Sequence, residues 1–457
     1  MKRFTADLLL YDGAFRRDAA LLVAVDGSIA AVGPAAEVTA VAGAEDTHLR
    51  GAVLPGAVNA HSHAFQILLR GKADGARDFR DWVDHYMYPL ALALDEDGLA
   101  AASRLAFAEM LLNGVTTVGE FFYLHNAPER DGCAARGNRN AETVIEAARS
   151  VGIRIHLLRC LYDRAVRPGQ RRFHEPAAEA VAATGELAAA HAGTARVSVG
   201  IAPHSLHGAT AEGIVAAAEY ARRQDQPFQI HIAEEEHDLA FAQEHYGTTP
   251  GRVLDDLGVL SGSTCVVHGV WLDGEEIARL GAVGGKLAYN PISNMALGDG
   301  VTDIPAMVAA GVTVALGCDG PGANHQVNVW QEMRFVEWLQ RVTQRRMNVV
   351  SHVPAAATAN YCFEMGTRNG GAVLGLPVGE LRPGWQADFV VLDTDDPSLL
   401  PHHGPEPAAL LHNVVNAMDA RAAVRDVWVG GEPVVRERRL VHADTHELAR
   451  AVAGWHC

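Results

Sequence analysis

The feature that most constrains the fold is a repeated alternation of short apolar runs with longer segments of helical spacing, between residues 50 and 320. The apolar runs, which are rich in β-branched residues, lie at 53–60, 116–121, 153–160, 197–203, 228–233, 265–268, 287–290 and 312–318. Helices are predicted between them at 96–112, 141–151, 177–192, 211–223 and 304–310. Strands that are apolar throughout are typical of a parallel sheet buried on both faces.

Eight parallel strands are the number that closes a (β/α)8 barrel of the TIM type, with the helices outside. A doubly wound open sheet is the alternative, but no predicted strand is followed by a G-x-G-x-x-G loop. We therefore predict an α/β protein in which residues 53–380 form the barrel.

The two ends of the chain have a different pattern, that of β-hairpins. Apolar runs near the N-terminus are separated by turns at Asp12-Gly13 and Asp26-Gly27, and a similar pair of runs near the C-terminus flanks Gly430-Gly431. Neither end is long enough to bury an apolar face alone. We predict that residues 1–52 and 381–457 pair into one small β-sandwich.

Composition narrows the classes of function. The formal charge of -17 and the lack of a long basic run disfavour binding to nucleic acid. No uncharged apolar stretch is long enough to span a membrane, and the six cysteines contain no Cys-x-x-Cys pair. The start of the chain does not match a signal peptide. These features favour a soluble, cytoplasmic protein that binds neither nucleic acid nor a membrane.

Histidines or acidic residues stand at the carboxyl ends of five of the eight predicted strands, where the active sites of such barrels lie. They are His61 and His63, His204, His231 and Glu234, His268, and Asp319. Singly, each has a structural explanation; Asp319, for example, could cap a helix. Their occurrence at equivalent positions favours a shared site.

The spacing of His61 and His63 suits a metal ion, because side chains at i and i+2 of a strand point to the same face. Three imidazoles and one carboxylate favour zinc, with iron or manganese as alternatives. A single divalent metal of this kind lowers the pKa of bound water to roughly 7 and so supplies hydroxide at neutral pH. Glu234, three residues beyond His231, is suited to a proton shuttle.

Several motifs in this order resemble the amidohydrolase superfamily, and specifically its metal-dependent aminohydrolase branch. That branch includes guanine and S-adenosylhomocysteine deaminases, chlorotriazine hydrolases and formimidoylglutamate deiminase. The motifs are Leu54-Pro55-Gly56 through His61-Ser62-His63, Ala202-Pro203-His204-Ser205, His231-Ile232-Ala233-Glu234, Val267-His268-Gly269, Asn290-Pro291-Ile292-Ser293-Asn294-Met295, Gly317-Cys318-Asp319-Gly320 and Arg382-Pro383-Gly384-Trp385-Gln386-Ala387-Asp388.

The resemblance implies a role for each strand-terminal residue. His61, His63, His231 and Asp319 would hold one metal ion. His268 and Asp319 would orient and deprotonate the water, and Glu234 would protonate the nitrogen of an amidine-type carbon before ammonia leaves. Two-metal members need a bridging carboxylate, commonly a carbamylated lysine on strand four, and residues 197–203 contain neither lysine nor acid.

The substrate is less well defined by the resemblance. Gln66 and Tyr123 fall where formimidoylglutamate deiminase contacts its substrate. That enzyme has two arginines at positions matched here by Val83 and His207. The guanidinium groups that would bind a substrate carboxylate through paired hydrogen bonds are therefore absent at these positions. The segment from Asp319 onwards instead resembles deaminases of nitrogen heterocycles.

Further candidate substrate contacts are His204, His207, Arg159 and Asn324, although Arg159 could pair with an acid and Asn324 could cap a helix. Trp82, His85, Tyr86 and Tyr88 could wall a pocket for a flat ring, or simply pack in the core.

We therefore expect a metal-dependent aminohydrolase that uses a metal-bound hydroxide to attack an amidine-type carbon of a small nitrogen heterocycle and releases ammonia. The alternatives are formimidoylglutamate deiminase and a catalytically silent barrel that serves as a scaffold. The resemblance also allows a homodimer, which no sequence feature specifies.

Overall fold

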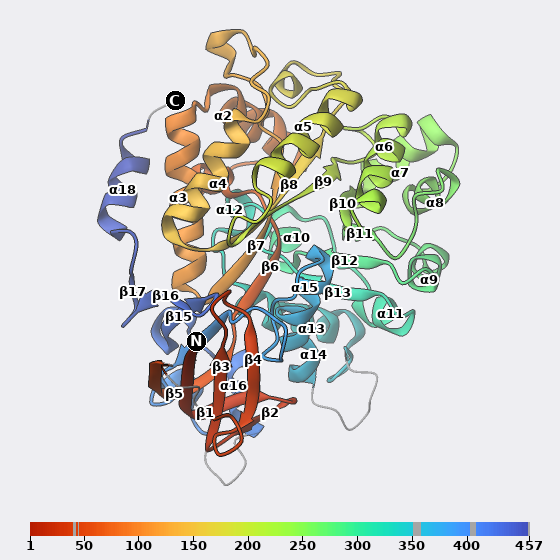
Figure 1. Cartoon of the computed structure of the whole chain (residues 1–457). Coiled ribbons are helices and arrows are strands. Elements are labelled where there is room, and N and C mark those ends of the chain that lie inside the picture. Colours follow the sequence, from red (N-terminus) through yellow and green to blue (C-terminus); the bar gives the residue numbers. More distant parts are fainter. Residues whose placement is uncertain (40–42, 44, 351–357, 403–407, 456–457) are drawn as a thin grey trace.

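The structure, a computed structural model, describes residues 1–39, 43, 45–350, 358–402 and 408–455. Strands from both ends of the chain form one nine-stranded mixed sheet at one end of the molecule (Figure 1). These strands are β1 (Lys2–Tyr11), β2 (Ala14–Arg16), β3 (Ala19–Val23), β4 (Ile29–Pro34), β5 (Glu45–Pro55), β14 (Phe389–Leu392), β15 (Val424–Val429), β16 (Glu432–Arg436) and β17 (Arg439–Leu440).

The pairing of the two ends occurs where β5 lies between β1 and β14, parallel to the first and antiparallel to the second. The rings of Phe4, Phe389 and Trp428 pack together on one face of these strands, with centroids 4.9 to 5.7 Å apart. Two sheets packed face to face are not confirmed, because the strands of both ends belong to one hydrogen-bonded sheet.

Two four-stranded parallel sheets form the centre of the molecule. The first contains β6 (Ala57–Ser62), β7 (Val115–Phe122), β8 (Arg154–Leu161) and β9 (Val197–Pro203). The second contains β10 (Phe228–Ile232), β11 (Thr264–His268), β12 (Lys286–Tyr289) and β13 (Thr313–Leu316). Most of their residues are buried, which agrees with the continuous apolar runs.

Single parallel bridges connect the two sheets at both edges. Ser205 after β9 pairs with His231 of β10, and Ser62 of β6 pairs with Asp319 after β13. The eight strands thus follow one another in chain order around a ring. The predicted first strand at 53–60 is divided, because residues 53–55 end β5 in the mixed sheet and β6 begins at Ala57.

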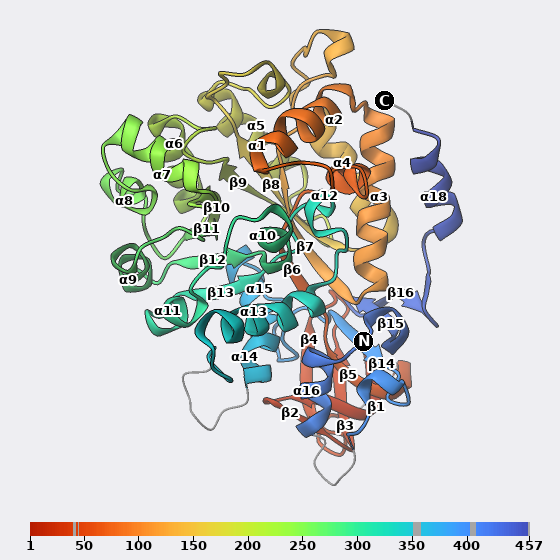
Figure 2. The ribbon, with the colours of Figure 1, turned by 180° about the vertical axis from the view of Figure 1, so that it is seen from behind.

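Helices surround the parallel strands, as both views show (Figures 1 and 2). Those along the barrel part of the chain are α1 (Phe79–Trp82), α2 (Tyr88–Ala93), α3 (Glu96–Leu112), α4 (Arg139–Val151), α5 (Ala177–Ala190), α6 (Ala211–Arg223), α7 (Glu236–Tyr246), α8 (Pro250–Asp256), α9 (Gly274–Ala282), α10 (Pro291–Leu297), α11 (Ile304–Ala309), α12 (Pro321–Asn324), α13 (Val329–Gln344), α14 (Thr358–Met365) and α15 (Arg368–Leu374). Short 3-10 turns cover Ala64–Leu69, Glu129–Asp131, Pro168–Arg172 and Pro397–Leu399, and a π-helical turn covers Val83–Met87.

Three helices follow near the C-terminus: α16 (Ala408–Asn416), α17 (Ala420–Ala423) and α18 (Thr445–Ala453). Figure 2 shows α18 beside α3, where Trp455 Nε1 donates to Asp95 Oδ1 at 3.0 Å. The same carboxylate oxygen caps α3 by accepting from the Gly98 amide at 2.9 Å. Within the described part of the chain, no helix is both long enough and apolar enough to cross a lipid bilayer.

Candidate active site

A cavity of about 370 Å³ opens at the carboxyl ends of the parallel strands, which is a volume suited to a small molecule. Nine of the predicted site residues line it: His63, Gln66, Tyr123, His204, His207, His231, Glu234, His268 and Asp319. His61 lies beneath them and is fully buried. The structure therefore brings together residues that lie at or just beyond the carboxyl ends of β6, β7, β9, β10, β11 and β13.

The ring of His61 is held by a buried glutamine. His61 Nδ1 donates to Oε1 of Gln229 at 2.9 Å, and Nε2 of that glutamine donates to the carbonyl of Ala60 at 2.8 Å. Because Nδ1 carries the proton in this arrangement, Nε2 of His61 presents a lone pair.

Backbone carbonyl groups hold the other two histidines in the same way. His63 Nδ1 donates to the carbonyl of Phe121 at 2.9 Å, and His231 Nδ1 donates to the carbonyl of His204 at 2.8 Å. Their Nε2 atoms therefore also present lone pairs. Metal-binding histidines in proteins are oriented by hydrogen bonds of this kind.

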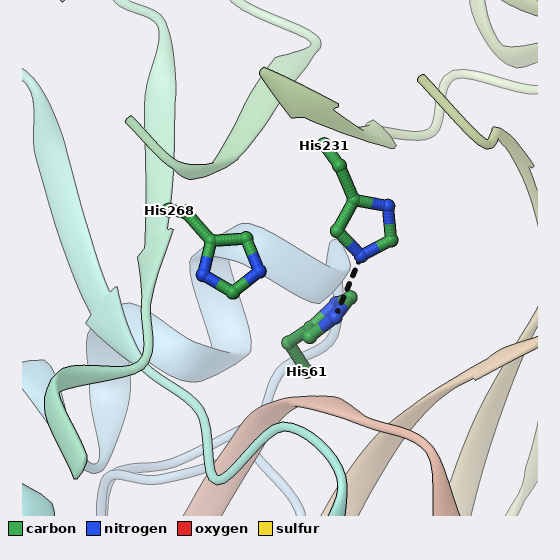
Figure 3. Close-up of side chains that lie close together, drawn as sticks. All are labelled: His61, His231 and His268. Carbon is green, nitrogen blue, oxygen red and sulfur yellow. Dashed lines mark hydrogen bonds between the residues drawn. The ribbon is translucent and has the colours of Figure 1, made fainter. Parts of the chain in front are cut away.

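The lone pairs of His63 and His231 both approach that of His61. Nε2 of His61 lies 3.2 Å from Nε2 of His63 and 3.2 Å from Nε2 of His231, the second approach being drawn in Figure 3. Asp319 Oδ1 lies 3.7 and 3.4 Å from Nε2 of His61 and His63. Two nitrogens bound to one tetrahedral zinc at 2.0–2.1 Å are about 3.3 Å apart. The donor set therefore fits a divalent cation.

Burial keeps these imidazoles neutral. It lowers the pKa of His61 to about 3, with a further contribution from His63, and it lowers the pKa of His63 and of His231 as well. Protons therefore do not compete for Nε2 at neutral pH.

Asp319 is the acidic member of the cluster. Its Oδ2 accepts a hydrogen bond from the Ser293 hydroxyl at 2.5 Å, which leaves Oδ1 directed at the histidines. Burial acts to raise the pKa of Asp319, but the interactions of its carboxylate with the His63 and His268 rings and the hydrogen bond from Ser293 outweigh burial, and the pKa is lowered. The side chain is therefore an ionised carboxylate.

Glu234 and His268 form a pair beside this cluster. Glu234 Oε1 lies 3.3 Å from His268 Nε2, and Nδ1 of the same ring accepts from the Asn294 amide at 3.0 Å. Burial, together with the charges of Asp299 and Asp319, raises the pKa of Glu234 well above its usual range. Glu234 therefore carries a proton where it can meet a ligand in the cavity.

Three residues at the carboxyl ends of the strands have left-handed backbone conformations: Ala233 with φ 53°, His268 with φ 68° and Asp319 with φ 54°. Non-glycine residues rarely adopt this region, which costs on the order of 1–3 kcal/mol for each. Here the turn redirects the chain directly after each strand, so that Glu234, His268 and Asp319 face the cavity.

Three other predicted contacts lie on the cavity wall. Gln66 Nε2 donates to the Tyr123 hydroxyl at 2.9 Å. His204 also faces the cavity, while its Nδ1 lies 2.9 Å from the Ser205 hydroxyl. Burial lowers the pKa of His204 well below the usual range, so this ring is neutral.

Arg159 and Asn324 do not line the cavity, contrary to the prediction. Arg159 is fully buried and forms two hydrogen bonds to the carboxylate of Glu175, at 2.7 and 2.9 Å. Asn324 donates to the carbonyl of Cys318 at 2.8 Å and to Glu332 at 2.6 Å. Both side chains are committed to partners within the protein.

The segment after β6 supplies cavity residues that were only partly predicted. Trp82 and Tyr88 line the cavity as aromatic walls, and the ring of Phe79 is stacked on Trp82 at 6.2 Å. His85 instead lies 2.9 Å from Asp81 at the surface. Phe79 follows a loop, where no periodicity marks a residue that faces inward.

Three arginines at the cavity wall were also missed: Arg80, Arg164 and Arg167. Arg167 pairs with Asp84 at 2.7 Å, and Arg164 lies over the ring of Phe241 at 4.8 Å. In the sequence, these arginines are visible only as basic residues in the segments that follow two of the predicted strands.

Comparison with known proteins agrees with this geometry. The amidohydrolase family model matches residues 52–434. A 5-methylthioadenosine/S-adenosylhomocysteine deaminase of Nitratidesulfovibrio vulgaris is 31% identical, over 93% of this chain and 90% of the relative. A 5'-deoxyadenosine deaminase of Methanopyrus kandleri is 28% identical, over 94% of this chain and 93% of the relative.

Among solved structures, an adenosine deaminase from Xanthomonas campestris with bound zinc is similar, with a TM-score of 0.85 and 25% identity, over 99% of this chain and 97% of that one. These similarities imply the TIM-barrel fold, in accord with the ring of eight parallel strands. The chain belongs to the amidohydrolase family.

Proposed function

We propose that the protein is a metal-dependent deaminase, which hydrolyses an amidine-type carbon of a small nitrogen heterocycle and releases ammonia. The observation that carries the proposal is the approach of two Nε2 lone pairs, those of His63 and His231, to within 3.2 Å of the lone pair of His61, in rings whose Nδ1 protons are already donated. Without a cation, such neighbouring lone pairs would repel one another.

The ligands we assign to the metal are His61, His63, His231 and Asp319. Three imidazoles and a carboxylate suit zinc, and the similar adenosine deaminase structure has zinc bound. A divalent ion held by this set supplies a Lewis acid that lowers the pKa of a water molecule toward neutrality.

The proton transfers are assigned to the neighbouring side chains. Asp319, an ionised carboxylate, would accept the proton of the attacking water and pass it to the departing amino group, and His268 would orient the water. Glu234, which burial keeps protonated, delivers a proton to the ring nitrogen of the substrate. Placing an acid and a base at one carbon is typical of hydrolysis that expels an amine.

The cavity walls favour a flat ring as the substrate. Trp82, Tyr88, Tyr123, Tyr162 and Phe173 line the cavity. Aromatic side chains of this kind bind planar heterocycles by stacking and edge contacts. Since the curated relatives named above deaminate adenosine derivatives, we place 6-aminopurine nucleosides first among the candidate substrates.

A formimino amino acid is the second candidate, and one observation favours it. Although Val83 and His207 replace the arginines of formimidoylglutamate deiminase, Arg80, Arg164 and Arg167 also line the cavity. A guanidinium group at any of these positions could pair with a substrate carboxylate.

The test is a screen for ammonia release from purines, pterins, pyrimidines, triazines and formimino amino acids, with metal analysis of the same preparation. We expect close to one tightly bound zinc per chain and release from an amino-substituted heterocycle. Faster release from N-formimino-L-glutamate would reverse the ranking of substrates. Protein with less than about half a metal per chain after zinc loading, and no release from any compound, would favour the scaffold alternative.

A further inference from the structure

We propose that a second divalent-cation site lies in the wall of the same cavity, formed by His207, His237 and Asp238. These residues are distinct from the ligands assigned above. We further propose that an ion at this site obstructs the entry of substrate, so that excess zinc inhibits the enzyme.

The geometry of this cluster resembles that of the deep one. Asp238 Oδ1 lies 3.4 Å from His207 Nδ1 and 3.6 Å from His237 Nε2, and the three atoms lie within 4.8 Å of one another. These separations are close to the distance of about 3.3 Å between two ligands of one tetrahedral zinc. Two imidazoles and a carboxylate leave a fourth position open, as in zinc sites that bind water.

The carboxylate of Asp238 is held in a fixed orientation. Its Oδ2 accepts hydrogen bonds from the backbone amides of Glu234 at 3.0 Å and Glu235 at 3.4 Å, at the start of α7. Oδ1 is not used by these bonds and faces the two imidazoles. The site is therefore preorganised on its acidic side.

The two imidazoles provide independent support. His207 Nδ1 is buried and, apart from Asp238 Oδ1 at 3.4 Å, has no polar partner among the described residues, although its ring is 31% exposed. Nδ1 of His237 lies 3.7 Å from Glu235 Oε2, so a carboxylate stands behind the ring whose Nε2 faces Asp238. A carboxylate in this position is typical of histidines that bind zinc.

The position of the cluster gives the proposed consequence. The rings of His207 and His237 line the same cavity as Glu234 and Asp319. The ring of His204 lies next to His207, with centroids 5.6 Å apart, and next to His231, with centroids 5.0 Å apart. An ion at the second site therefore lies beside the path to the deep one.

The test is a zinc titration of the metal-free full chain against a chromophoric chelator. We expect two zinc equivalents for the unaltered protein, and one for His237→Gln and for His207→Gln. His245→Gln is the matched control, because His245 is on the same helix and lines the same cavity, but its ring packs on Phe241. Asp238 is left unchanged because it caps α7.

The two sites are separated by a second comparison. His231→Ala should lose the tight equivalent and keep the weaker one, whereas His237→Gln should do the reverse and resist inhibition by added zinc. Binding of a single equivalent by the unaltered protein, or of two by His237→Gln, would overturn the second site without affecting the proposed function. Absence of the tight equivalent from the unaltered protein, with the weaker one still present, would count against the proposed function only.

Discussion

Replacement of Gln229 by methionine tests whether the hydrogen bond behind His61 prepares the metal site. The glutamine is fully buried, accepts from His61 Nδ1 at 2.9 Å and donates to the Ala60 carbonyl at 2.8 Å. Without this acceptor, the imidazole proton can move to Nε2 and remove the lone pair. Partners of this kind contribute 10- to 100-fold in metal affinity, which is about 1.4–2.7 kcal/mol.

The assay is competition for zinc between the metal-free protein and a chelator of known affinity. The matched control is Gln340→Met, because Gln340 is also buried and donates to a carbonyl, that of Thr302 at 2.9 Å, and Thr302 bonds the backbone of His268 rather than an assigned metal ligand. Both variants leave a carbonyl group without its donor and should lose similar stability, about 1–3 kcal/mol. Unchanged zinc affinity in a folded Gln229→Met protein would refute the reasoning.

Two further predictions concern buried carboxylates. Burial raises the pKa of Glu120 from 4.5 to about 8, so the native state holds a proton that the unfolded chain releases, and stability falls as the pH rises between these values. In urea denaturation of the metal-free protein, Glu120→Gln should reduce the dependence of the unfolding free energy on pH, by up to roughly 5 kcal/mol between pH 4.5 and about 8. An unchanged dependence would contradict the raised pKa of Glu120. Glu175→Gln should leave Arg159 buried without its partner and lower the free energy of unfolding by about 3–5 kcal/mol. Because Arg159 is outside the cavity, KM of folded Glu175→Gln should stay unchanged; a rise in KM at unchanged kcat would instead indicate a substrate contact.

The parallel strands could be predicted because they are buried on both faces, which makes their sequences apolar throughout. Runs such as 197–203 and 265–268 agree with β9 and β11 to within a residue. The division at Pro55 was not predicted, because the apolar pattern continues while the hydrogen-bonding partners change from the mixed sheet to a parallel sheet. The domain boundaries at residues 52 and 380 stay a prediction.

The candidate metal ligands could be predicted because each stands at or just beyond the end of a strand. The groups that orient them could not. Gln229 lies within β10, and its contact with His61 of β6 depends on how side chains meet across the ring of strands. Arg159 is equally close to a strand end, but its partner Glu175 lies in a later loop, and no local pattern joins the two.

The central claim is that binding the metal and transferring the proton are separate tasks of neighbouring residues. Zinc content and ammonia release should therefore be measured together for His231→Ala and Glu234→Gln, using the best substrate from the screen. We predict that His231→Ala loses zinc and turnover, whereas Glu234→Gln keeps the full zinc content and loses about 10²- to 10⁴-fold in kcat. Full turnover of zinc-loaded Glu234→Gln, or loss of its zinc, would contradict the account.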